Sequence, residues 1–165
     1  MKKQGFTLIE LMVVIVIMGI LAAVAVPKLF GMIAKSKASE VPTAAGTWIN
    51  MQDAYFQEKG SVGDWVQIGY SAPGAKASGN PSSYSSSVFN YAGNSCGGSN
   101  CTWSATPKVK LNDCPANAIG WQLQAANTGS NGDGTYTNFV LTSTSNTNSD
   151  CKALTASWDN LTGSH

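Results

Sequence analysis

Glu10 is the residue whose surroundings most clearly require a chemical partner. It lies five positions after Gly5 and directly before an unbroken apolar run of residues 11–26. That run is long enough to enter a bilayer, where an unpaired carboxylate costs about 3 kcal/mol or more. We therefore expect the Glu10 carboxylate to bind a cation or a hydrogen-bond donor.

One local partner is available to Glu10. Thr7 and Glu10 match the capping-box pattern, in which a threonine caps a helix and a glutamate three residues later reaches back to the N–H of the cap. Such a box would satisfy Glu10 within its own chain and needs no functional role. Matches of this kind are common by chance, so the pattern alone does not decide between the two roles.

Four cysteines follow in the second half of the chain: Cys96, Cys101, Cys114 and Cys151. An exported segment favours disulfides, and four cysteines allow three pairings. We favour Cys96–Cys101, across a four-residue loop, and Cys114–Cys151, which closes the C-terminal region. A zinc site is the competing interpretation, but the chain has no Cys-x-x-Cys pair and its one histidine is the terminal His165.

The sequence contains no recognisable catalytic group. A Ser-His or Cys-His dyad would have to rest on the chain end at His165. Residues 131–133 with Asp150 have the residue types of a calcium site, but turn formation is the commoner role of Asn and Asp. We expect no enzyme activity, no metal and no cofactor, since the remaining acidic residues are scattered: Asp53, Glu58, Asp64, Asp113 and Asp159.

The segment that positions Glu10 is predicted to be a membrane helix. With the apolar residues that flank it, the run exceeds the ~20 residues that span a bilayer. Lys2 and Lys3 place its N-terminal end in the cytoplasm, so the rest of the chain lies outside. A cleaved secretory signal is the alternative, with residues 23–25 as the cleavage site. Glu10 at the start of the run, and the amphipathic pattern beyond it, argue against that alternative.

An amphipathic helix is predicted to continue beyond the run. Apolar residues recur at intervals of three, four and seven positions up to about Gln57, and Gly60 is a stop signal. Pro42 is either a second kink or a first-turn residue where the helix restarts. At 1.5 Å per residue the whole helix approaches ~75 Å, so half of it must project from a domain of this size.

The remainder of the chain predicts a small antiparallel sheet packed on the C-terminal half of the helix. Apolar or alternating patches lie at residues 65–70, 87–91, 108–111, 119–125 and 136–142, and the last two are the best strand candidates. Residues 131–134, Asn-Gly-Asp-Gly, read as the hairpin turn between them. Segments 71–87 and 94–104 are rich in Gly, Ser and Asn and read as surface loops.

Composition excludes one class of partner. Only 12% of the residues are charged, against about 25% in typical domains. The ten basic residues are scattered lysines and the net charge is +1, which argues against a nucleic-acid-binding groove. Tryptophans could stack on sugars and give surface adhesion if exposed, although a core position is the expected one: Trp65, Trp103, Trp121 and Trp158.

Residues 5–10, Gly-Phe-Thr-Leu-Ile-Glu, resemble the processing site of type IV prepilins and of the pseudopilins of type II secretion. The likeness covers residues 2–33: a short basic leader, Gly before Phe, a glutamate five residues into the mature chain, and an apolar segment that ends at Pro27. It implies cleavage between Gly5 and Phe6 by a prepilin peptidase, which then methylates the Phe6 amine.

The resemblance also implies an architecture, partners and a location. The fold is the α+β pilin fold, with leader 1–5, a hydrophobic membrane and filament-core half-helix 6–30, and a globular domain 31–165 whose helix runs to about 58. Glu10 of one subunit pairs with the Phe6 amine of its neighbour, and the helix bends or melts between Gly19 and Pro27 on assembly. The Cys114–Cys151 bridge resembles the disulfide-bounded C-terminal region of many type IV pilins.

The implied function is that of a structural subunit. Assembly machinery of the bacterial inner membrane would build it into a homo-oligomeric extracellular pilus for adhesion or twitching motility. A pseudopilin of a type II secretion system is the alternative. A monomeric membrane-anchored binding protein, not processed at Gly5, is a third possibility from a different class.

Overall fold

The N-terminal third of the chain forms one long helical column. The computed structural model describes residues 5–94, 96, 100–130, 136–144 and 147–164. Helix α1 (Leu8–Ala38) and helix α2 (Glu40–Lys59) follow one another with only Ser39 between them. Pro42 lies in the first turn of α2, where a missing N–H costs no intrahelical bond. Gly60 ends α2 in the left-handed conformation at φ 66° and donates to the carbonyl of Phe56.

A seven-stranded antiparallel sheet packs against α2. Its strands lie in chain order as a meander, and β5 and β6 form the longest pairing. The strands are β1 (Ala75–Lys76), β2 (Ser83–Ser85), β3 (Phe89–Gly93), β4 (Asn100–Pro107), β5 (Trp121–Ser130), β6 (Tyr136–Ser143) and β7 (Gly163–Ser164). A short helix α3 (Ser149–Lys152) and a 3-10 turn (Trp158–Leu161) precede β7.

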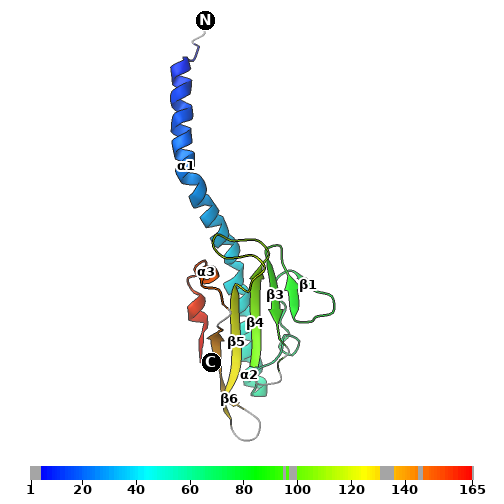
Figure 1. Cartoon of the computed structure of the whole chain (residues 1–165). Coiled ribbons are helices and arrows are strands. Elements are labelled where there is room, and N and C mark those ends of the chain that lie inside the picture. Colours follow the sequence, from blue (N-terminus) through cyan, green and yellow to red (C-terminus); the bar gives the residue numbers. More distant parts are fainter. Residues whose placement is uncertain (1–4, 95, 97–99, 131–135, 145–146, 165) are drawn as a thin grey trace.

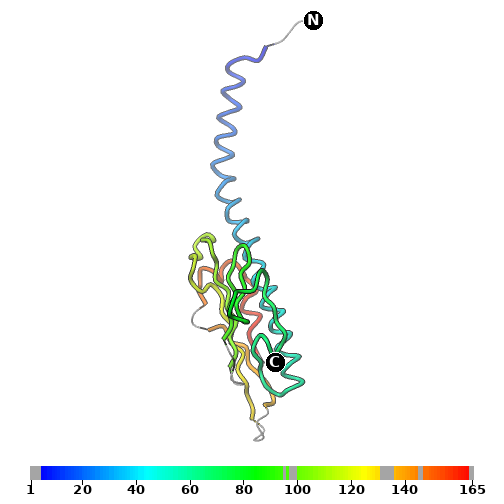
Figure 2. The backbone as a smooth tube through the Cα atoms, turned by 90° about the vertical axis from the view of Figure 1, so that its right-hand side faces the viewer, coloured from blue at the N-terminus to red at the C-terminus, as the bar shows by residue number. Residues whose placement is uncertain are grey.

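The predicted α+β fold is confirmed, with α1 projecting from the head and α2 packed on the sheet (Figure 1). Figure 2 shows the same arrangement from the side, with the chain beyond α2 gathered around the lower half of the column. Within α1 only Ala34 and Ala38 are buried. Most of α1 is therefore exposed, whereas α2 is packed in the head, although one helical column contains both helices.

Alternating residues on the strands build the core. Cys101, Trp103 and Ala105 of β4 are fully buried on the face toward α2, and Phe139 and Leu141 of β6 share this burial. All five tryptophans are buried with no exposed surface, so none offers a stacking platform for a sugar: Trp48, Trp65, Trp103, Trp121 and Trp158. Adhesion through exposed tryptophans is thus wrong for this structure.

Four local predictions are wrong. Segment 71–87 is not a loop throughout, because it contains strands β1 and β2. Segment 94–104 is not a loop throughout, because β4 begins at Asn100; its small polar residues hide the alternation of Cys101 and Trp103. Residues 65–69 form turns, and residues 108–111 hold only an isolated bridge at Leu111. The predicted hairpin turn at 131–134 lies outside the described residues.

Buried hydrogen bonds fasten the helical column to the sheet. The Tyr70 hydroxyl donates to the carbonyl of Ala44 at 2.9 Å and accepts from Trp103 Nε1 at 3.0 Å. The Tyr91 hydroxyl donates to Glu40 Oε1 at 2.7 Å. Burial raises the pKa of both phenols, so they keep their protons and act as donors. These bonds fix α2, and with it the direction in which α1 leaves the head.

Gly93 lies close against the buried ring of Trp65. A Cβ atom at Gly93 would overlap the indole nitrogen of Trp65, and that ring is held between Tyr70 and Tyr84 with centroid separations of 4.8 and 6.1 Å. The substitution Gly93→Ala should lower the free energy of unfolding by about 1–3 kcal/mol, the usual cost of overpacking. Denaturant unfolding of the full chain in detergent measures it.

Gly46 supplies the matched control. It lies inside α2, and a Cβ there meets no atom within 4 Å. Gly46→Ala should raise the free energy of unfolding by about 0.5–1 kcal/mol through helix propensity. Equal effects of the two alanine substitutions would contradict the packing assigned to Gly93.

Candidate functional site

The start of α1 presents the predicted processing site. Gly5, Phe6 and Thr7 precede the first helical residue and are exposed, with 86% of Phe6 accessible. A Cβ at Gly5 would meet no atom within 4 Å. The Gly5–Phe6 bond therefore lies in non-helical, open chain, which is the conformation a peptidase needs to reach a peptide bond.

Glu10 is engaged by its own chain in this structure. Its Oε2 accepts from the Thr7 backbone N–H at 2.8 Å and from the Thr7 hydroxyl at 2.7 Å, and the Glu10 N–H donates to Thr7 Oγ1 at 3.3 Å. Both halves of the capping box are present. Within the described residues no cation lies against the carboxylate, so any charged partner must come from elsewhere.

Residues Leu8 to Ile33 of α1 form an apolar arm that the head does not cover. Its large side chains are between 42% and 76% exposed on every side of the helix, from Leu8 to Ile33. An 18-residue window in the helix has a mean hydropathy of 2.9 and no buried residue. A helix that is apolar all round requires lipid or other helices around it. This is the length and composition of one membrane span.

The arm is a continuous helix through its two weak positions. Pro27 lies inside α1, where its ring removes one intrahelical hydrogen bond. A Cβ at Gly19 would meet no atom within 4 Å. Figure 1 shows the column changing direction gradually on its way to the head. The helix is intact between Gly19 and Pro27 in the isolated chain, and the expected bend or melting concerns the assembled state.

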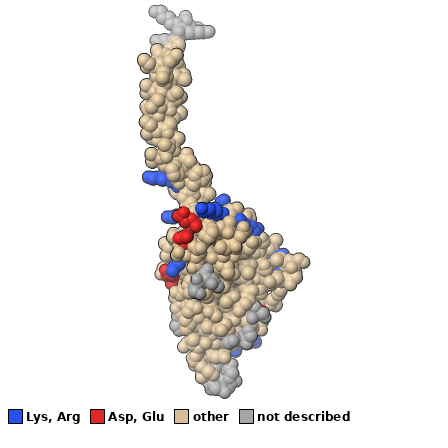
Figure 3. Space-filling view, viewed as in Figure 1, with Lys and Arg blue, Asp and Glu red and all other residues tan. Residues whose placement is uncertain are grey.

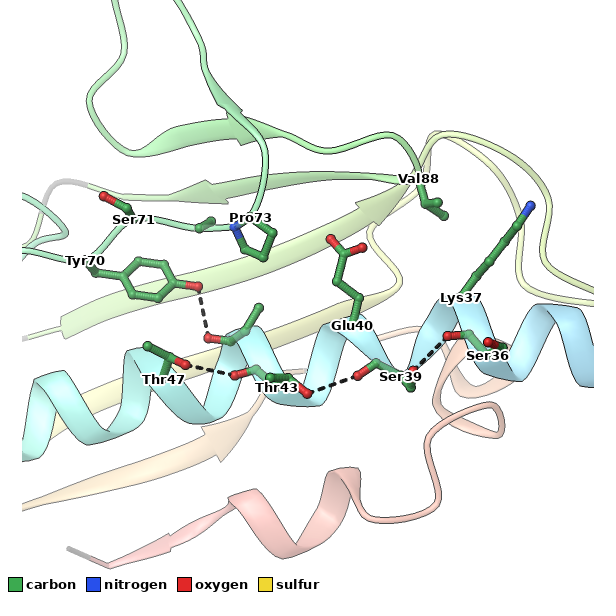
Figure 4. Close-up of a pocket in the computed structure, with 12 residues that line it drawn as sticks. Ser36, Lys37, Ser39, Glu40, Thr43, Thr47, Tyr70, Ser71, Pro73 and Val88 are labelled. Carbon is green, nitrogen blue, oxygen red and sulfur yellow. Dashed lines mark hydrogen bonds between the residues drawn. The ribbon is translucent and has the colours of Figure 1, made fainter.

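A groove lies where α1 passes into α2. It encloses about 580 Å³ between the helices and the segment from Tyr70 to Pro73, with Val88 at its edge. Its helix hydroxyls are occupied: Ser39 donates to Ser36, Thr43 to Ser39, and Thr47 to Thr43, in each case to a backbone carbonyl (Figure 4). The hydrogen bonds described among its helix residues run from hydroxyls to backbone carbonyls and join no nucleophile to a base.

Acidic and sulfur ligands for a metal do not gather in the part of the chain that the structure describes. No group of three His, Cys, Asp or Glu side chains there lies close enough to hold an ion. The calcium alternative at residues 131–133 falls outside the described residues, and Asp150 lies exposed in α3.

The four cysteines form two disulfides. Cys96 is joined to Cys101, five residues away, and Cys114 to Cys151, 37 residues away. The second bridge links α3 to the turn after β4. Within that turn, Leu111 and Cys114 exchange backbone hydrogen bonds of 3.0 Å. Sequence reasoning did not anticipate that residues 110–112 of this turn lie beside the end of α1, where they line a hollow with Phe30 and Ile33.

The two disulfides should differ in what they contribute. In the chain-entropy view the 37-residue separation contributes about 4 kcal/mol and the short loop about 2 kcal/mol. Cys114→Ala with Cys151→Ala should therefore destabilise the head more than Cys96→Ala with Cys101→Ala. Chemical unfolding of both double variants under non-reducing conditions tests the order, and a larger loss for the short loop would contradict it.

Comparison with known proteins points to the same end of the chain. A family model described as the prokaryotic N-terminal methylation motif matches residues 1–26. The type IV major pilin protein PilA of Myxococcus xanthus is 43% identical over 70 residues, which cover 42% of this chain and 32% of that protein. The type IV major fimbrial protein FimA of Dichelobacter nodosus is 38% identical over 92 residues, covering 55% and 57%.

A third relative is also named as a fimbrial protein. The fimbrial protein EcpC of Eikenella corrodens is 47% identical over 58 residues, which cover 35% of this chain and 38% of that protein. The chain thus spans a third to somewhat more than half of the length of these relatives. No solved structure matches it. The motif and the relatives together support the resemblance to type IV pilins.

Proposed function

We propose that this chain is a structural subunit of a type IV pilus that polymerises through α1. One observation carries the proposal: a complete membrane-length arm, apolar on every side, is left uncovered by its own head. Residues 1–5 act as a leader that is removed, residues 6–30 anchor the subunit in the membrane and later form the filament core, and residues 31–165 form the outer domain.

The course of assembly follows from the arm. A prepilin peptidase cuts the exposed Gly5–Phe6 bond and methylates the Phe6 amine while the arm lies in the inner membrane. Assembly machinery then transfers the subunit from lipid to the base of an extracellular filament for adhesion or motility. The arm passes from lipid to protein without meeting water, so little hydrophobic free energy is lost in transfer. The relatives are named as pilin and fimbrial proteins, which favours a pilus over the pseudopilin alternative.

Glu10 sets the register between neighbouring arms in this proposal. Cleavage leaves the Thr7 N–H in place and creates a positive amine on Phe6, at a helix end that already carries about half a positive charge. In the monomer Glu10 is satisfied by Thr7. In the filament the carboxylate instead pairs with the Phe6 amine of a neighbour, because an uncompensated amine buried among apolar helices is strongly unfavourable.

Processing is tested on the subunit isolated from its native membrane. The mature protein should begin at Phe6 and carry the added mass of one methyl group on its amine. Intact-mass and N-terminal peptide mass spectrometry give the answer. A chain that begins at Met1 would favour the anchored monomeric class, and one that begins after Ala25 would favour a secretory signal.

Two variants separate the charge of Glu10 from its capping role. Glu10→Gln keeps an acceptor for the Thr7 N–H but removes the charge, whereas Thr7→Ala removes the hydroxyl cap and keeps the charge. Glu10→Gln should lower the yield of sheared fibres at least about tenfold, since breaking a buried ion pair costs about 3–5 kcal/mol. Thr7→Ala should leave the yield close to normal.

Immunoblots of sheared fibres, normalised to the subunit in the cell, compare the two variants. The reverse order, with fibres lost in Thr7→Ala and kept in Glu10→Gln, would show that helix capping and not charge pairing governs assembly.

A further inference from the structure

The head carries lysines at the level where the apolar arm enters it. Lys28, Lys35, Lys37 and Lys110 are exposed and form what we call the basic collar. Figure 3 shows a shaft without charged side chains on the face in view, and basic side chains at the neck with acidic ones beside them. Three of the lysines come from α1 and the fourth from the turn after β4, so two separate segments of the chain meet here.

The fold fixes the position of Lys110. The Cys114–Cys151 disulfide holds the turn, and Lys108 donates to the carbonyl oxygen of Ser86 beside it. Lys110 and Lys37 line one hollow of about 220 Å³ together with Phe30 and Ile33 of the arm. Two of the collar lysines therefore border the same hollow as the last apolar residues of α1.

The collar lysines have no charged partner within the described residues. The ion pairs present there are Lys59–Glu58 at 2.8 Å, at the far end of α2, and Lys152–Asp159 at 2.6 Å, beside the α3 end of the Cys114–Cys151 bridge. Three acidic residues lie near the collar: Asp113, three positions after Lys110; Glu40, whose carboxylate accepts from Tyr91; and exposed Asp150, next to Cys151 of the bridge to the turn. The neck thus keeps an excess of positive charge.

The length of the arm places the collar at a bilayer surface. Residues 8–27 span about 30 Å at 1.5 Å per residue, the thickness of the hydrocarbon layer. Lys28 then follows at its outer edge. Phe30 and Met32, beyond Lys28, are 64% and 69% exposed and fit the interfacial layer, where lysine stems also extend outward. Lys35, Lys37 and Lys110 consequently lie at the height of the lipid headgroups.

We propose that the basic collar binds anionic phospholipid headgroups of the outer leaflet and seats the head on the membrane before assembly. Basic residues next to a membrane helix are attracted to such headgroups, and the attraction decays within a Debye length. The seating holds the subunit upright at a fixed depth while it waits to join a filament. The inference rests on the membrane stage of the proposed function and names the lipid that this stage requires.

The test uses the full mature chain with a nitroxide label at Val109→Cys, reconstituted in phosphatidylcholine vesicles with or without phosphatidylglycerol. Val109 is 46% exposed beside Lys110. Collision with oxygen and with a water-soluble nickel complex reports the depth of the label. Phosphatidylglycerol should shift the label toward the bilayer, and molar salt should abolish the shift by screening.

Charge-matched variants locate the effect. Lys110→Gln should reduce the shift, because it removes one of the four collar charges, whereas Lys59→Gln should leave it intact, since Lys59 lies at the far end of α2 and contacts Glu58. Equal depths in the two lipids, or equal losses in the two variants, would overturn the proposal. So would a shift that appears only at a high protein-to-lipid ratio, because the partner would then be a second copy of the chain.

The same samples distinguish a failure of the proposed membrane stage from a failure of the proposed basic collar. Failure of the arm to insert into either vesicle would contradict the membrane stage of the proposed function. Insertion without any dependence on phosphatidylglycerol would contradict the basic collar alone.

Discussion

An apolar surface that the chain cannot cover by itself is the constraint on which the rest of this structure depends. From Leu8 to Ile33 the helix offers large hydrophobic side chains in all directions, and burying each one fully is worth about 1.5–3 kcal/mol. Exposure of this segment to water is therefore strongly unfavourable. Lipid and a bundle of identical helices can each cover this apolar surface. A subunit that passes from one to the other buries the same surface in both environments.

The head is built so that this arm leaves it in a fixed direction. Tyr70 links the α2 backbone to Trp103 of the sheet, and Tyr91 links β3 to Glu40 at the start of α2. The Cys114–Cys151 bridge holds the turn that packs beside the end of α1. Since these contacts cluster at the join between arm and head, they stabilise the point where force and orientation would be transmitted along a filament.

Periodicity and composition predicted the arm, the stop at Gly60 and strands β5 and β6, because each has a local signal that packing does not override. Strand β4 was missed because small polar residues mask Cys101 and Trp103 in a segment that resembles a loop. The hydrogen bond of Tyr91 to Glu40, and the hollow that residues 110–112 share with α1, join residues far apart in the sequence. No single-chain pattern predicts such contacts, since they exist only once the sheet has formed.

A side-chain-resolution structure of fibres sheared from cells that make this chain tests the central claim most directly. The claim predicts fibres composed of this subunit, with the segment from Leu8 to Ile33 packed among its copies at the axis and each Glu10 carboxylate beside the Phe6 amine of a neighbour. Fibres that lack the chain, or that carry its arm on the outer surface, would contradict it.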